Sequence, residues 1–146
     1  ERAMDRTEIN GLRDRVANEL SGGERARALI ARALAVEACT LVVDEPLAAL
    51  DPGHQLQIMA LLKAEAAAGA LVIAVLHDLA MAARFCDRLL LIHEGTLVAD
   101  GAPPTVLTAE NLHACYDIRA WTGTIEDQPV VVPLARSSPP GAAKPR

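Results

Sequence analysis

Apolar residues fall into two patterns along this chain, and the two patterns predict helices and strands at different places. Between Glu24 and Val36 they recur every three or four positions, which is the spacing of one buried helical face. Two short runs, Leu41–Val43 and Leu71–Leu76, are apolar without polar alternation, which is typical of strands covered on both faces. We therefore expect a helix followed by fully buried strands. The residues expected on the buried stripe of the helix are Ala26, Leu29, Ile30, Ala33 and Leu34.

Two further helices continue the pattern, and together with the strands they predict an α/β fold. The segment Gly53–Ala68 reads as a helix, because Asp51 is a good N-cap and Pro52 suits a first helical turn. A shorter helix is expected over Leu79–Phe85, with Asp78 as its cap. The residues expected on one face of the longer helix are Leu56, Met59 and Ala60.

The next part of the chain predicts a β-hairpin. Arg88–Ile92 reads as a third strand, and Glu94-Gly95 reads as a turn into a second strand over 96–99. The sequence Gly-Ala-Pro-Pro at 101–104 breaks this pattern.

A short helix and a tail are expected to end the chain. Thr108 is expected to cap the helix, and a last edge strand is expected near Val130–Val132. Residues 136–146, rich in Ser, Pro, Gly and Ala, are expected to be disordered. The residues expected on the apolar face of the helix are Leu112 and Tyr116.

Composition narrows the class of protein. The chain has 14 Lys and Arg against 19 Asp and Glu, and its net charge of −5 argues against a general nucleic-acid surface. The longest apolar run, Ala70–Leu76, is far shorter than the roughly 20 residues of a membrane span. Cys39, Cys86 and Cys115 are odd in number and widely spaced, which favours reduced thiols over a metal site.

Ser21, Gly22 and Gly23 open the first long helix. Backbone N–H groups at a helix N-terminus attract anions, and glycines let a phosphate approach them closely. An ordinary loop with an N-cap serine is the alternative interpretation, and it stays open for these three residues taken alone.

Polar groups end both predicted strands, where open α/β sheets place their ligands. Asp44 and Glu45 follow the first strand, and because neighbouring strand residues point to opposite sides, they cannot share one role. One carboxylate could hold a hydrated Mg²⁺ while the other faces a reacting water. His77 follows the second strand, and a neutral imidazole there could donate a hydrogen bond to a phosphate oxygen or to the water.

Taken in order, the motifs LSGGE, DEP, AALD and VLHDL resemble the second half of an ABC-type ATPase. They correspond to that family's signature motif, Walker B strand, D-loop and switch histidine, and the resemblance covers nearly the whole chain. No segment matches GxxxxGK[ST], the phosphate-binding Walker A loop. The resemblance therefore implies the C-terminal portion of a P-loop ATPase: a mostly parallel sheet flanked by helices, with the Walker A strand missing. By the same resemblance, 1–19 is the end of a helical subdomain and 20–135 a partial ATPase core.

The resemblance also implies ATP and Mg²⁺ as cofactors, held between two subunits paired head to tail. Ser21, Gly22, Gly23 and Glu24 would contact ATP held by a second copy, and Asp51 would couple the two sites. Asp44 would hold Mg²⁺, Glu45 would orient or deprotonate water, and His77 would contact the γ-phosphate. Alone, the chain is expected to bind ATP negligibly. It is also expected to be marginally stable, or to close its sheet over the missing strand, because unpaired buried edges promote aggregation.

Peripheral segments resemble the subfamily that imports iron–siderophores, haem or cobalamin: His54-Gln55, GAPPTVLTAENL and QPVVVPLAR. The implied partners are a second ATPase subunit, two membrane permease subunits and, indirectly, a periplasmic binding protein, without nucleic acid. The implied location is the cytoplasmic face of the bacterial inner membrane.

Two other functions compete with the importer. A soluble ABC-class ATPase of translation or DNA repair also carries LSGGE and AALD, although Pro46 argues against the DNA-repair type and the acidic charge argues against a nucleic-acid partner. A non-enzymatic truncated remnant fits the missing Walker A loop, whereas Glu45 and His77 favour a complete parent enzyme.

Overall fold

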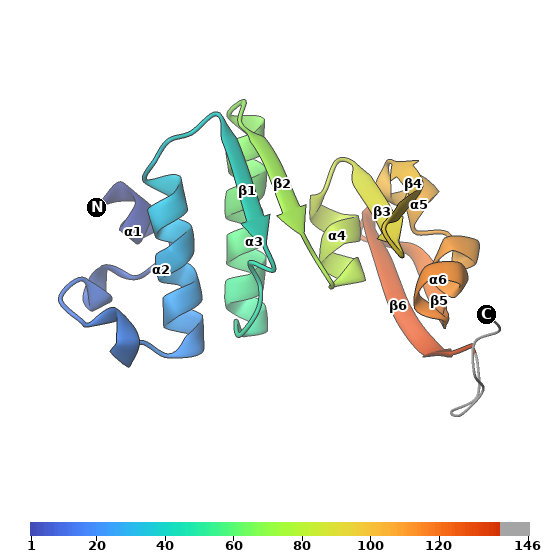
Figure 1. Cartoon of the computed structure of the whole chain (residues 1–146), viewed down its shortest axis with the longest axis horizontal. Helices are drawn as coiled ribbons and strands as arrows, with labels where there is room; N and C mark the ends of the chain where they lie inside the picture. Colours follow the sequence, from blue (N-terminus) through green and yellow to red (C-terminus); the bar gives the residue numbers. More distant parts are fainter. Residues whose placement is uncertain (138–146) are drawn as a thin grey trace. The chain divides into compact units, whose positions relative to one another are not determined.

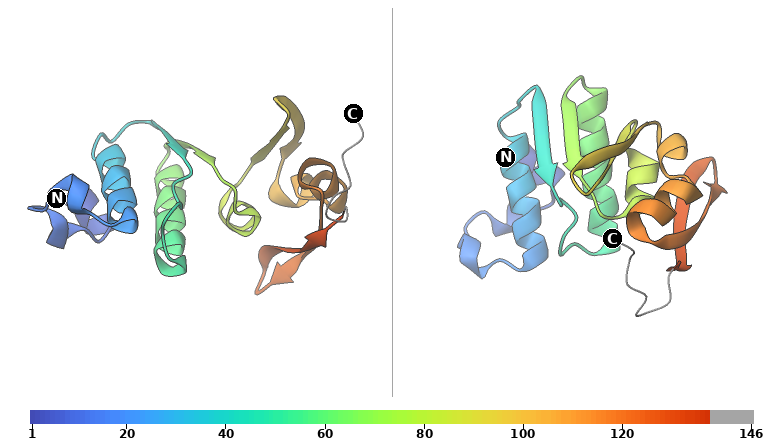
Figure 2. Two further views of the ribbon diagram at one scale, coloured as in Figure 1. Left: turned by 60° about the horizontal axis from the view of Figure 1, so that its bottom comes forward. Right: turned by 45° about the vertical axis from the view of Figure 1, so that its right-hand side comes forward.

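The computed structural model describes residues 1–137, which form two compact units, an N-terminal unit of Glu1–His77 and a C-terminal unit that begins at Asp78 (Figure 1). β1 and β2 of the N-terminal unit pair in parallel, with Thr40 opposite Leu71 and Asp44 opposite Val75. α3 connects these strands and packs against β2 (Figure 2). The elements of this unit are α1 (Arg2–Arg6), the 3₁₀ turns Asn10–Leu12 and Ala17–Glu19, α2 (Gly22–Leu34), β1 (Thr40–Asp44), α3 (Pro52–Ala67) and β2 (Leu71–Val75).

Both long helices begin where the sequence places their caps. The Ser21 and Glu24 side chains form a capping box at the start of α2, and Asp51 caps α3 with Pro52 in its first turn. The predicted starts of these helices are therefore confirmed to within two residues.

The expectation that the two strands are covered on both faces is wrong for the described chain. Alternate residues of β1 and β2 lie on an exposed face, where Val42 is 66% exposed opposite Ile73. The other residues of each strand are half-buried. A continuous apolar run fixes the strand but does not tell whether a second layer covers it.

The buried faces of the two long helices also differ from the predicted stripes. Ile30 and Leu34 of α2 are buried as expected, but Leu29 is about half exposed. In α3, Met59 is buried as expected, whereas Leu56 and Ala60 are exposed. Both helices carry Ala, Leu or Ile on several sides, so spacing alone does not select one face. The residues that complete the buried faces are Ala31 in α2 and Ile58 and Leu62 in α3.

The C-terminal unit contains two antiparallel hairpins, β3–β4 and β5–β6. α4 contacts β6 and α6 contacts β5. A buried cluster of Ala83, Leu107, Leu112 and Val131 forms the core. The elements are α4 (Leu79–Phe85), β3 (Leu89–His93), β4 (Thr96–Gly101), α5 (Pro103–Val106), α6 (Ala109–Tyr116), β5 (Ile118–Ile125) and β6 (Gln128–Arg136).

Several predictions for this unit are confirmed. The hairpin turns at the expected place, Asp78 accepts hydrogen bonds from the Ala80 and Met81 amides, and Thr108 caps α6. Leu112 is fully buried, but Tyr116 is 42% exposed and does not belong to the apolar face as expected.

The sequence analysis did not predict α5 or β5, and it underestimated the length of β6. The strand pattern does break at 101–104, where β4 ends at Gly101 and α5 begins with Pro103 in its first turn. β5 was not predicted, since its sequence mixes polar residues with Gly123 and lacks an apolar run. β6 is much longer than 130–132 and includes Arg136, the first residue of the expected tail. The rest of that prediction, 138–146, lies outside the described residues.

The sheets of the described residues confirm an α/β fold and locate its parallel part. Among residues 1–137, parallel pairing occurs only between β1 and β2, and both hairpins are antiparallel. None of the helices within 1–137 has the length and apolar character needed to cross a bilayer.

Candidate functional site

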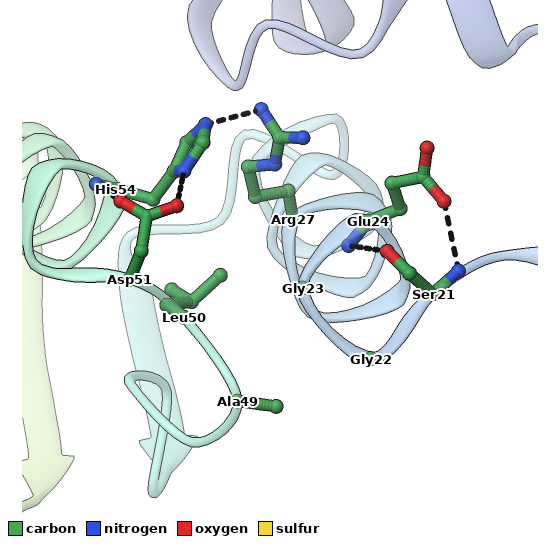
Figure 3. A pocket seen from close by; sticks show the side chains of 9 residues that line it. All are labelled: Ser21, Gly22, Gly23, Glu24, Arg27, Ala49, Leu50, Asp51 and His54. Carbon is green, nitrogen blue, oxygen red and sulfur yellow. Dashed lines mark hydrogen bonds and ion pairs between the residues drawn. The ribbon is translucent and has the colours of Figure 1, made fainter.

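The start of α2 is built from reciprocal hydrogen bonds between Ser21 and Glu24. The Ser21 Oγ accepts from the Glu24 amide at 3.3 Å, and the Glu24 carboxylate accepts from the Ser21 amide at 2.8 Å (Figure 3). These bonds, with Arg15 3.3 Å away, lower the pKa of Glu24 below its ordinary value. The carboxylate is therefore held ionised, and the N-cap interpretation of Ser21 is confirmed.

Gly22 and Gly23 lie where the loop after β1 packs onto α2. A Cβ at Gly22 would lie 3.1 Å from the Ala49 Cβ, and one at Gly23 would lie 3.2 Å from the Ala49 carbonyl oxygen. A side chain at either position would therefore crowd Ala49, so glycine here favours close packing of the loop against α2, besides any ligand. Next to this contact is a pocket of about 420 Å³ (Figure 3), lined by Ser21, Gly22, Gly23, Glu24, Arg27, Ala49, Leu50, Asp51 and His54.

Asp51 faces this pocket from the loop before α3 and carries two hydrogen bonds from His54. Its carboxylate accepts from the His54 amide at 3.1 Å and lies 2.5 Å from the His54 Nδ1. The His54 ring is the main cause that lowers the pKa of Asp51 below its ordinary value. The second ring nitrogen, Nε2, lies 2.8 Å from a guanidinium nitrogen of Arg27 on α2 (Figure 3).

Glu45 and His77 meet at the carboxyl ends of the two parallel strands. The His77 Nε2 lies 2.7 Å from a Glu45 carboxylate oxygen, and both side chains are more than half exposed. The Glu45 amide donates to the Val75 carbonyl at 3.1 Å, which extends the pairing of the two strands by one bond. A carboxylate bonded to an imidazole at an open edge can accept a proton from water and pass it on.

Asp44 is the last residue of β1 and is exposed. The expectation that Asp44 and Glu45 point to opposite sides assumed that the strand continues through Glu45. Glu45 instead has φ of 46°, so strand alternation ends at Asp44. No cluster of three or more His, Cys, Asp or Glu suited to a metal occurs within 1–137. A single carboxylate still fits Mg²⁺, which proteins often hold with one or two carboxylates and substrate phosphates.

The structure thus brings the predicted site residues together in two groups. Ser21, Gly22, Gly23, Glu24 and Asp51 line the pocket. Glu45 and His77 form a separate pair, and neither they nor Asp44 line that pocket. The predicted site did not include Arg27, and His54 entered the predictions only in a segment that resembles the importer subfamily. His54 lies three residues after the cap Asp51, on the same side of the first helical turn, and this spacing was the signal that could have predicted their contact.

Comparison with known proteins shows which family this chain is similar to. The family model described as ABC transporter matches residues 1–48. The ferric enterobactin transport ATP-binding protein FepC of Escherichia coli is 40% identical over 141 residues, covering 94% of this chain and 52% of that protein. The chain resembles the ATP-binding subunits of ABC transporters.

Other relatives and solved structures of ABC ATPases agree with this identification. The cobalamin import ATP-binding protein BtuD of Halobacterium salinarum is 42% identical, covering 85% of this chain and 31% of that protein. The hemin import ATP-binding protein HmuV of Streptomyces coelicolor is 47% identical, covering 79% and 41%. The structure of a metal-chelate type ABC transporter in an inward-facing conformation matches with a TM-score of 0.79 at 28% identity, covering 93% of this chain and 56% of the other.

A second solved structure, a dimeric ATP-binding cassette in a post-hydrolysis state with ADP and Pi, matches with a TM-score of 0.65 at 32% identity, covering 70% and 44%. The chain spans about a third to a half of the length of the curated relatives it matches. The fold is thus that of part of an ABC ATPase domain.

Proposed function

We propose that this chain is part of the ATP-hydrolysing subunit of an ABC importer that transports an iron–siderophore complex, haem or cobalamin. The observation that carries the proposal is the 2.7 Å contact between Glu45 and His77 at the ends of adjacent parallel strands. The names of FepC, BtuD and HmuV support import of this substrate class over a soluble ATPase of translation or DNA repair.

In the proposed mechanism Glu45 is the general base for the attacking water. Its carboxylate accepts the water's proton, while the bonded His77 keeps the carboxylate oriented and contacts the γ-phosphate. Asp44, at the same strand end, would hold the Mg²⁺ of Mg-ATP; that ion, when bound, neutralises charge on the phosphate oxygens. A positioned general base contributes about 10²–10⁴ in rate, so Glu45 would supply a large share of turnover.

The pocket at the start of α2 would serve ATP held by a second copy of the subunit. The first amides of a helix lack intrahelical acceptors, so Gly22 and Gly23 offer N–H donors beside the Ser21 hydroxyl. Because this pocket does not include Glu45 or His77, the two groups would act on different ATP molecules within a head-to-tail dimer. Asp51, which lines the pocket, would link them. The partners proposed are two membrane permeases and a periplasmic binding protein at the cytoplasmic face of the bacterial inner membrane.

The test measures ATP turnover by the gene product that carries this sequence, reconstituted with its permeases. We expect Glu45→Gln to lower turnover by about 10²–10⁴ while ATP binding persists, and His77→Ala to lower turnover likewise. Glu94→Gln and His93→Ala are matched controls, since both residues lie at the β3–β4 turn of the C-terminal unit. Equal turnover in Glu45→Gln and Glu94→Gln would refute the proposal.

A further inference from the structure

His54 connects two parts of the N-terminal unit that are far apart in sequence. Its Nδ1 lies 2.5 Å from the Asp51 carboxylate, and its Nε2 lies 2.8 Å from the Arg27 guanidinium. Arg27 belongs to α2, whereas Asp51 ends the loop that follows β1. Both ring nitrogens are thus engaged, in a side chain only 31% exposed.

These contacts fix the protonation of the ring. A guanidinium only donates hydrogen bonds, so the Nε2 beside Arg27 must be the acceptor and carry no proton. An ionised carboxylate only accepts, so the Nδ1 beside Asp51 must carry the proton. The geometry therefore requires a neutral His54 with its proton on Nδ1.

The side chain of the neighbouring residue, Gln55, binds the backbone of the same loop. Its side-chain amide donates to the Leu47 and Leu50 carbonyls at 3.4 and 3.2 Å. His54 thus bonds the Asp51 side chain at the end of the loop, while Gln55 bonds two backbone carbonyl groups within the loop. Arg27 in turn donates at 3.4 Å to the Glu8 carbonyl, so the connection extends to the chain before α2.

We propose that His54 is a positioning residue: its Nδ1 donates to Asp51 and its Nε2 accepts from Arg27, so the ring fixes Asp51 and the loop 46–51 against α2. Ser21, Gly22 and Gly23 open this same helix, so His54 sets where Asp51 lies relative to them. Its effect on turnover rests on the proposed function, but the state of the ring does not.

The first experiment measures the ring state directly, by nitrogen-15 NMR of the histidine side chains of the 146-residue chain. We expect His54 to be neutral with its proton on Nδ1. We expect Arg27→Met, which keeps the apolar stem but removes the donors, to shift the Nε2 signal, while Nδ1 keeps its proton beside Asp51. Arg25→Met is the matched control, because Arg25 is an exposed arginine on the same helix. A proton on Nε2 in the unaltered chain, or a ring unchanged by Arg27→Met, would overturn the proposal.

The second experiment measures the loop and its function. Losing one hydrogen bond of ordinary strength raises local opening by about 3–10-fold, so the His54 amide should exchange faster by that factor in Arg27→Met. In the reconstituted gene product, Arg27→Met should lower ATP turnover several-fold relative to Arg25→Met. His54→Asn, which keeps a donor near the position of Nδ1, should retain more ATP turnover than His54→Ala. Equal turnover in Arg27→Met and Arg25→Met would overturn the positioning role. Failure of the proposed function would instead show as unchanged turnover in Glu45→Gln.

Discussion

Two leucines of α3 provide a sharp test of which face of this helix is buried. Leu62 is 3% exposed and Leu56 is 38% exposed, although spacing in the sequence favoured Leu56 as the buried residue. Truncation to alanine removes three carbons from each, worth about 0.8 kcal/mol per carbon when fully buried, or about 2.4 kcal/mol. Leucine and alanine have nearly equal helix propensity, so the backbone contributes little to either change.

The expected costs differ because only one site leaves a cavity. For Leu62→Ala, the transfer cost and an unfilled cavity together predict a loss of about 3–4 kcal/mol, within the usual range of about 2–5. For Leu56→Ala, about three-fifths of the transfer cost applies and water refills the space, giving about 1.5 kcal/mol. Urea denaturation of the 146-residue chain, with unchanged slopes, gives both values. A cost for Leu56→Ala equal to or above that for Leu62→Ala would refute this assignment of the buried face.

Four further outcomes follow from the structure. Thr108→Ala should cost about 1 kcal/mol in urea denaturation, because it removes the side-chain cap of α6. The pKa values of Asp51 and Glu24 lie below their ordinary 3.8 and 4.5. The stability they contribute is therefore present above those values and is lost as pH falls through the folded pKa. Asp51→Asn and Glu24→Gln should each reduce the loss of stability measured on acidification. Burial raises the pKa of Tyr116, the single tyrosine, so ultraviolet absorbance should show it titrating above 10.0 when folded and near 10.0 in urea. The 146-residue chain, which contains no GxxxxGK[ST] segment, should show negligible ATP binding by calorimetry, and tight binding would contradict this.

Caps and motif order were predictable from the sequence, because each depends on a few neighbouring residues. Ser21, Asp51, Asp78 and Thr108 all cap helices where their side chains predicted them. Glu45 and His77 were predicted at adjacent strand ends because parallel strands align their carboxyl ends, and the structure places them 2.7 Å apart. Their catalytic roles stay predictions.

Features that depend on distant packing could not be predicted in this way. The exposure of Val42 reflects the lack of a layer over one face of β1–β2 among the described residues, which no local pattern reports. The β5–β6 hairpin turns at Glu126 and Asp127, both with positive φ, and neither residue is the glycine or asparagine that usually marks such a turn. The Arg27–His54 contact joins residues 27 positions apart, so only the folded chain reveals it.

The contact of Ala49 with Gly22 and Gly23 has a mechanical consequence. A Cβ at Gly22 or Gly23 would lie 3.1 or 3.2 Å from Ala49, so the loop would have to shift by a few tenths of an ångström to accept a side chain at either position. We therefore expect alanine at either glycine to move the loop that ends at Asp51 slightly away from the first turn of α2.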